Sequence, residues 1–90
     1  MHSTGDPARD RAIELVRTEL DRLRAAGPAA VRDLAPSSPI DADRGEVTLT
    51  TRVVVEGERL MVLVEAWRGR RTLATNGFAM LPDGTTHTPD

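Results

Sequence analysis

The sequence predicts an α+β protein in which one amphipathic helix, followed by a short second helix, packs on an antiparallel meander of three or four strands. Apolar residues recur at helical spacing in an N-terminal segment and alternate with polar residues at strand spacing in a later one. Single glycines divide that later segment into strands of similar length. The chain has 90 residues and a mass of 9.8 kDa, so we expect one domain, 1–90.

Composition narrows the function classes. The net charge is -2 and the isoelectric point is near 5.6, which argues against a nucleic-acid binder or a membrane-surface protein. The chain has no cysteine, which excludes a disulfide framework, a thiolate nucleophile and a cysteine-ligated metal. No motif predicts a metal or a cofactor, and no apolar stretch reaches membrane-spanning length. The expected protein is soluble and cytoplasmic.

The first helix is expected over residues 7–26, after a tail of residues 1–6. Asp6 supplies an N-cap oxygen and Pro7 has the backbone geometry of a first helical residue, while Gly27 and Pro28 end the helix. Its polar face should carry two ion pairs at i,i+3 spacing, Glu14 with Arg17 and Asp21 with Arg24. Its apolar stripe comprises Ala12, Ile13, Val16, Leu20 and Leu23.

A short second helix is expected over 28–34, with Val31 and Leu34 turned inward. Pro36, Pro39 and Gly45 then predict an irregular loop over 35–45.

Residues 46–81 are expected to form a meander of three strands, 46–56, 59–68 and 72–81, with turns at Gly57 and Gly69. Gly77 lies inside the third strand and predicts either a bulge or the close approach of another chain segment. Residues 82–90 contain a turn and then either a tail or a short fourth strand.

Two-residue turns at Gly57 and Gly69 set the expected register of the three strands. The first turn places Glu56 opposite Arg59, and the second places Met61 opposite Phe78 and Trp67 opposite Thr72. Leu63 then faces Asn76. A turn of another length would slip the third strand and exchange its two faces.

This register leaves apolar side chains on both faces of the sheet, although only one long helix is available to cover them. A second copy of the chain is the expected cover, because a two-fold dimer needs one self-complementary patch. The alternative is that the short helix or the loop 36–45 folds over the second face. The predicted interface residues are Val54, Met61, Leu63, Trp67, Phe78 and Met80.

Glu65, Arg52 and Asn76 are weak candidates for catalysis, since this register brings them together among apolar side chains on the second face. The alternative interpretation is that Arg52 and Glu65 form a structural ion pair within or across an interface. Arg68, Arg70 and Arg71 concentrate positive charge at the second turn and are a possible contact for an acidic partner.

The order of helix, short helix, loop and antiparallel strands is similar to that of cystatin-like and nuclear-transport-factor-like rolls, in which a curved sheet wraps a helix. This resemblance implies either a non-catalytic dimer or a small-molecule pocket with cyclase or isomerase chemistry. In this chain, such weak chemistry would use Glu65 and Arg52. The first expectation is a non-catalytic, homodimeric interaction or regulatory module. The small-molecule roll is the second, and an inhibitor or immunity-type protein that blocks another protein is the third.

Overall fold

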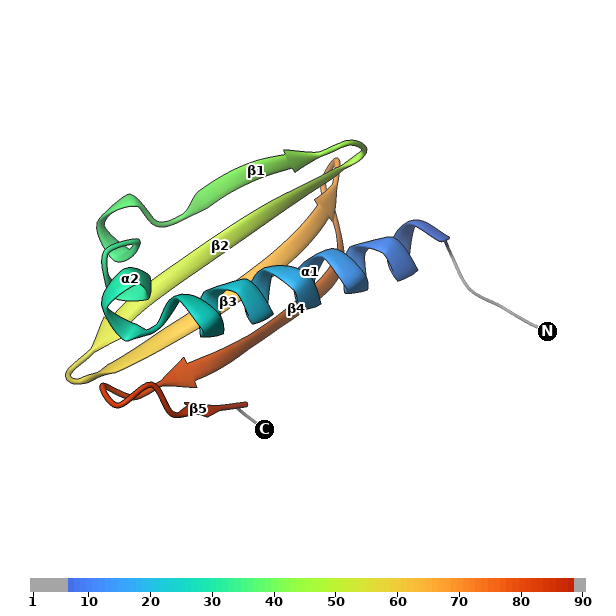
Figure 1. Cartoon of the computed structure of the whole chain (residues 1–90). Coiled ribbons are helices and arrows are strands. Elements are labelled where there is room, and N and C mark those ends of the chain that lie inside the picture. The colour runs from blue at the N-terminus through green and yellow to red at the C-terminus, as the bar shows by residue number, and fades with distance from the viewer. Residues whose placement is uncertain (1–6, 89–90) are drawn as a thin grey trace.

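Helix α1, Pro7–Ala26, lies across one face of a twisted antiparallel sheet in the computed structural model, which describes residues 7–88 (Figure 1). The helix has the expected bounds, and both expected ion pairs form: Arg17 Nη1 lies 3.5 Å from Glu14 Oε1, and Arg24 Nη1 lies 3.1 Å from Asp21 Oδ1. The buried stripe comprises Ala12, Val16, Leu20 and Leu23. Ile13 differs from the prediction, because it stays 39% exposed at the edge of the stripe.

The short helix α2, Pro28–Arg32, is followed by a 3-10 turn, η1, Ala35–Ser37. Val31 of α2 is fully buried in the same core as α1, and Leu34 and Ala35 pack against that core. The helical segments therefore all contribute to one side of the sheet. The alternative in which the short helix covers the second face is wrong.

The sheet contains β1, Ile40–Arg44; β2, Val47–Glu56; β3, Arg59–Arg68; β4, Arg71–Met80; and β5, Thr86–His87. The strands lie side by side in chain order, each antiparallel to the next. The predicted loop 35–45 is thus wrong over 40–44, which pairs with β2 as an edge strand. This added strand and β5 raise the strand count to five.

One turn recurs through the meander. Gly45, Gly57 and Gly69 each open a two-residue connection, and each has a positive φ, of 74°, 61° and 63°. Glycine adopts this left-handed backbone without the steric cost that other residues bear, which suits the tight turns of twisted hairpins. The glycines stand twelve positions apart, so each hairpin repeats the last.

The register of β2 with β3 is the predicted one: Glu56 lies opposite Arg59, and Arg52 lies opposite Leu63. The β3–β4 register also begins as predicted, with Trp67 opposite Thr72. A β-bulge then shifts the pairing by one residue, so that Ala66 lies opposite Ala74.

The bulge reverses the predicted faces of the rest of β4. Met61 lies opposite Ala79, not Phe78, and Leu63 lies opposite Gly77, not Asn76. Side chains alternate along a strand, so this one-residue slip turns Phe78 and Met80 toward α1. Both are fully buried in the core.

The chain ends its described part in a tight turn and the two-residue strand β5, which pairs with Ala79 and Met80. Gly84 N–H donates to the Leu81 carbonyl, and Leu81 N–H donates to the Thr85 carbonyl at 2.8 Å. Asp83 Oδ1 accepts from the backbone N–H of Thr85, also at 2.8 Å. Of the two alternatives for 82–90, a short additional strand is the one that forms.

The Asp83 turn should respond to acid. A side-chain hydrogen bond from Thr85, with its backbone N–H, holds the pKa of the Asp83 carboxyl below the ordinary value of 3.8. The carboxylate therefore stabilises the turn above pH 3.8, and this contribution is lost as pH falls through the lower folded pKa. NMR titration of the Asp83 carboxyl should give a midpoint below 3.8, and Thr85→Val should raise it. A midpoint at or above 3.8 in the unaltered protein would contradict the assignment.

Candidate functional site

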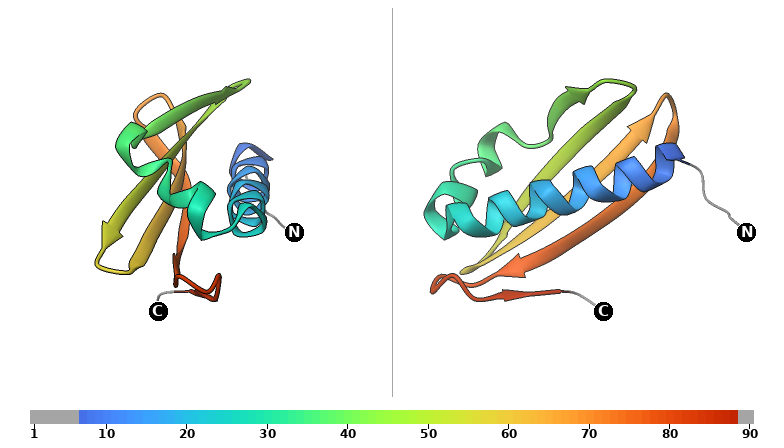
Figure 2. Two further views of the ribbon diagram at one scale, coloured as in Figure 1. Left: turned by 60° about the vertical axis from the view of Figure 1, so that its left-hand side comes forward. Right: turned by 45° about the vertical axis from the view of Figure 1, so that its right-hand side comes forward.

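The sheet face opposite α1, here called the open face, has no helix over it in the described part of the chain. In the left view of Figure 2, α1 stands to one side of the sheet. The molecule measures 44 × 25 × 19 Å, and its least dimension is that of two layers. Val54 and Leu63 lie on the open face and are 53% and 40% exposed.

The open face brings together four of the six predicted interface residues. Val54 pairs directly with Met61, and Leu63 is the next outward residue of β3. Trp67 lies on the same face of β3, nearer the turn at Gly69. We call these four residues the open-face patch. Phe78 and Met80 do not belong to it, because the bulge places them in the core.

An ion pair crosses the middle of this patch. Arg52 Nε donates to Glu65 Oε1 at 3.3 Å, between neighbouring strands β2 and β3. The predicted pairing of these two side chains is therefore present. Asn76 does not join them, since it lies on the helix side of β4, where its Oδ1 accepts from Gly77 N–H at 2.8 Å. The three catalytic candidates are not assembled into one site.

Trp67 lines a shallow hollow of about 350 Å³ at the β1 end of the open face. Its indole Nε1–H is buried and has no acceptor among the described residues. A buried donor without a partner costs about 1–3 kcal/mol, so this unsatisfied N–H lowers the stability of the fold. The other residues that line the hollow are Pro39, Asp41, Thr48, Thr50, Arg52 and Gly69.

Sequence reasoning missed the contribution of β1 to this hollow. Asp41 Oδ1 accepts from Thr50 Oγ1 at 2.7 Å, and Asp43 Oδ1 accepts from Thr48 Oγ1 at 3.4 Å. These cross-strand hydrogen bonds fix a strand whose two aspartates disfavour strand structure. The signal that could have revealed β1 is Gly45, which has the same spacing from Gly57 as Gly57 has from Gly69.

Arg68 lies opposite Arg71 across the second turn, and Arg68, Arg70 and Arg71 are all exposed there. Arg68 Nη2 lies 3.9 Å from Glu46 Oε2, an ion pair that spans β3 and the β1–β2 turn. Arg71 lies at the start of β4, where it lines a recess together with Arg9 of α1.

Within residues 7–88, no three histidine, aspartate or glutamate side chains are grouped so that they could hold a metal ion. The described helices are also too short or too polar to cross a membrane. Comparison with models of known protein families, with curated proteins and with solved structures found no match.

Proposed function

We propose that this protein is a non-catalytic interaction module that forms a homodimer through the open face. The observation that carries the proposal is the exposure of Val54 and Leu63 on a sheet face that no described helix covers. Water-exposed apolar side chains grouped on one face are typical of a surface that binds another protein.

The dimensions of the open face suit a second copy. Strands β2, β3 and β4 have ten residues each and are about 33 Å long, β1 has five residues, and neighbouring strands lie about 4.8 Å apart. Two such faces in contact would bury about 1,100 Å² in total, which lies at the low end for a specific interface. A dimer of this size is expected to dissociate on dilution.

The charges on the open face also favour self-association. Arg52 of β2 and Glu65 of β3 lie side by side near the middle of the patch. Each protomer therefore presents one positive and one negative charge at this point. A two-fold axis through this point sets Arg52 of one protomer beside Glu65 of its partner, which leaves no charge buried without an opposite charge.

Leu63→Glu should convert the dimer to a monomer. The substitution places a second carboxylate beside Arg52, which already pairs with Glu65, so the interface would bury one carboxylate without an opposite charge. Leu63 is 40% exposed, so the monomer itself should fold. Light scattering after size exclusion should give twice 9.8 kDa for the unaltered protein and 9.8 kDa for the variant.

Ile13→Glu is the matched control, because Ile13 has nearly the same exposure, 39%, but lies on the helix side. It should leave the dimer mass unchanged. A monomeric mass for the unaltered protein throughout a dilution series from millimolar protein would refute the proposal, and so would a dimer that persists in Leu63→Glu.

A further inference from the structure

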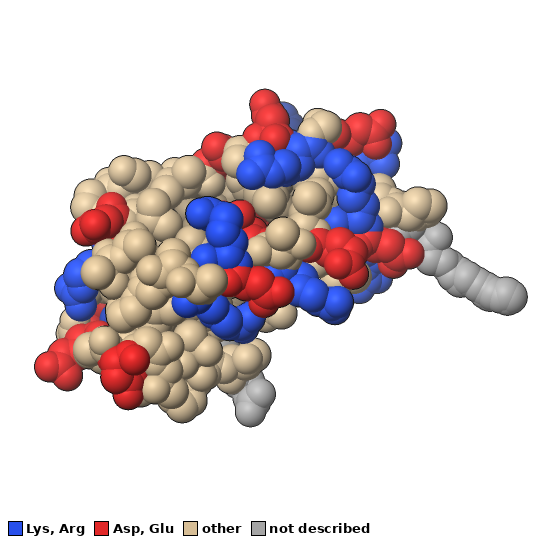
Figure 3. Space-filling view, in the orientation of Figure 1, with Lys and Arg blue, Asp and Glu red and all other residues tan. Residues whose placement is uncertain are grey.

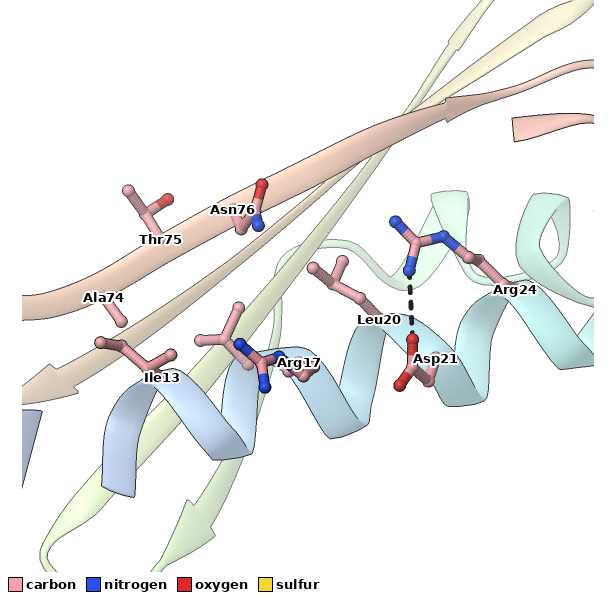
Figure 4. Close-up of a pocket in the computed structure, with 9 residues that line it drawn as sticks. Ile13, Arg17, Leu20, Asp21, Arg24, Ala74, Thr75 and Asn76 are labelled. Carbon is pink, nitrogen blue, oxygen red and sulfur yellow. Dashed lines mark hydrogen bonds and ion pairs between the residues drawn. The ribbon is translucent and has the colours of Figure 1, made fainter. Parts of the chain in front are cut away.

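A groove runs between α1 and β4 on the helix side of the sheet, away from the open face. One recess of this groove has a volume of about 360 Å³ and is drawn in Figure 4, where Ile13 of α1 lies near Ala74 of β4. A second recess shares Ile13 and Ala74 with the first, and a third shares Arg9 and Thr72 with the second. The three form one continuous groove.

The β4 wall of this groove is an unpaired strand edge. Strand β5 pairs with β4 only at Ala79 and Met80, so the described chain provides no neighbour strand along Arg71–Phe78. Gly77 N–H points away from β3, since it donates to the Asn76 side chain. Alternate residues of an antiparallel strand direct their backbone groups to the same side, so Thr75 also presents its N–H and C=O outward.

The rim of the groove is basic. Arg9, Arg17 and Arg24 line it from α1, and Arg71 lines it from β4, against one acidic residue, Asp21. Asp21 is paired with Arg24, and Arg17 is paired with the exposed Glu14. Neither Arg9 nor Arg71 has an ion pair with another described residue. Figure 3 shows this face, where arginines follow α1 with acidic groups between them.

The spacing along α1 matches that of an extended chain. Arg9, Ile13 and Arg17 stand four residues apart and line the groove in that order. Four helical residues rise about 6 Å, and two strand residues span about 6.8 Å. An added strand would therefore set every second side chain against Arg9, Ile13 and Arg17 in turn.

We propose that this groove binds an extended acidic peptide segment of another protein, which adds to the free edge of β4. The segment carries the pattern acidic, x, apolar, x, acidic, with the apolar side chain over Ile13 and the acidic ones beside Arg9 and Arg17. Main-chain hydrogen bonds to β4 supply affinity, and the alternating pockets supply selectivity. Gly77 N–H already donates to the Asn76 side chain and cannot bond to an added strand, so the added strand ends near Thr75.

The test uses a synthetic probe, acetyl-Thr-Glu-Thr-Val-Thr-Glu-Thr-amide with a fluorescent label, and the full-length protein. Fluorescence anisotropy should give a dissociation constant on the order of 100 μM at low salt, and binding should weaken as salt is added. Amide NMR shifts should change along α1 and over the first half of β4. The Arg9→Glu, Arg17→Glu double variant should bind at least tenfold more weakly.

Two matched probes separate this mode from simple charge attraction. A probe with lysine in place of glutamate should bind the double variant and not the unaltered protein. Two further probes, N-methylated at alternate sets of residues, should behave differently, because only one set of N–H groups faces β4. Equal binding by both methylated probes would overturn the proposal, as would an oligothymidine of similar charge that binds as tightly as the peptide.

The groove and the dimer can fail independently, because they use opposite faces of the sheet. The Arg9→Glu, Arg17→Glu double variant should keep the dimer mass, and Leu63→Glu should keep its affinity for the probe. Loss of probe binding in Leu63→Glu would contradict the separate placement of the two surfaces.

Discussion

Gly77→Ala should lower the free energy of unfolding by about 3 kcal/mol, the upper part of the range for forcing an extra group into a packed interior. A Cβ at position 77 would meet the Val62 carbonyl oxygen of β3 far inside 3.0 Å, a separation that real Cβ atoms essentially never show. The oxygen belongs to the backbone of the central strand, so it cannot move without opening the β3–β4 ladder. Urea unfolding followed by circular dichroism would measure the loss.

Gly57→Ala is the matched control for this effect. Gly57 has a positive φ of 61°, but a Cβ there would meet nothing within 4 Å. Alanine should therefore cost only the strain of the left-handed backbone, about 1 kcal/mol. Equal losses for the two variants would mean that β3 and β4 are not as close at Gly77 as the structure places them.

Phe78→Ala should cost about 4 kcal/mol, since it empties a fully buried aromatic site in the core. The Phe78 ring is covered on one side by Arg24, whose guanidinium carbon lies 4.8 Å from the ring centre. The cavity would open between β4 and α1, where both elements are held by the rest of the core. The midpoint of urea unfolding should fall accordingly.

Thr75→Ala tests the same strand at an exposed position and should cost less than about 1 kcal/mol. The comparison decides between the two registers of β4. A small loss for Phe78→Ala would place this ring on the open face, as the unbulged register requires, and would contradict the observed pairing.

The helix and the first hairpin were predictable because their signals are local. Helix α1 begins at Pro7 and ends just before Gly27 and Pro28, so both bounds follow from local sequence signals, although the predicted N-cap Asp6 lies outside the described residues. The turn at Gly57 sets the β2–β3 register in the same way, and the predicted pairing of Arg52 with Glu65 across it is present.

The second half of β4 was not predictable from the turn alone. One extra residue at the bulge exchanges its faces, and the sequence pattern of each half is compatible with either arrangement. The clue in the sequence is the odd spacing between Leu73 and Phe78, which puts two large apolar residues on opposite faces of a regular strand. The bulge turns both toward the core, where both are buried. The predicted open-face patch was therefore too large by Phe78 and Met80.

Of the two options predicted for Gly77, the close approach is the one found. The bulge lies nearer the turn, between the residues that face Ala66 and Trp67. A glycine within a strand is compatible with either a bulge or a close backbone approach, and only the distance to the neighbouring backbone distinguishes the two.

The repeated turn also bears on how the sheet assembles. Each of the three hairpins closes over a two-residue connection. The loss of chain entropy on closing each hairpin is therefore small and similar. Each strand pairs with the strand next to it in the sequence, because the spatial order of the strands is their chain order. The main contact between segments that are distant in the sequence is that of α1 with β4. The meander can therefore form one hairpin at a time, and the docking of α1 on β4 is the step that makes the main long-range contact.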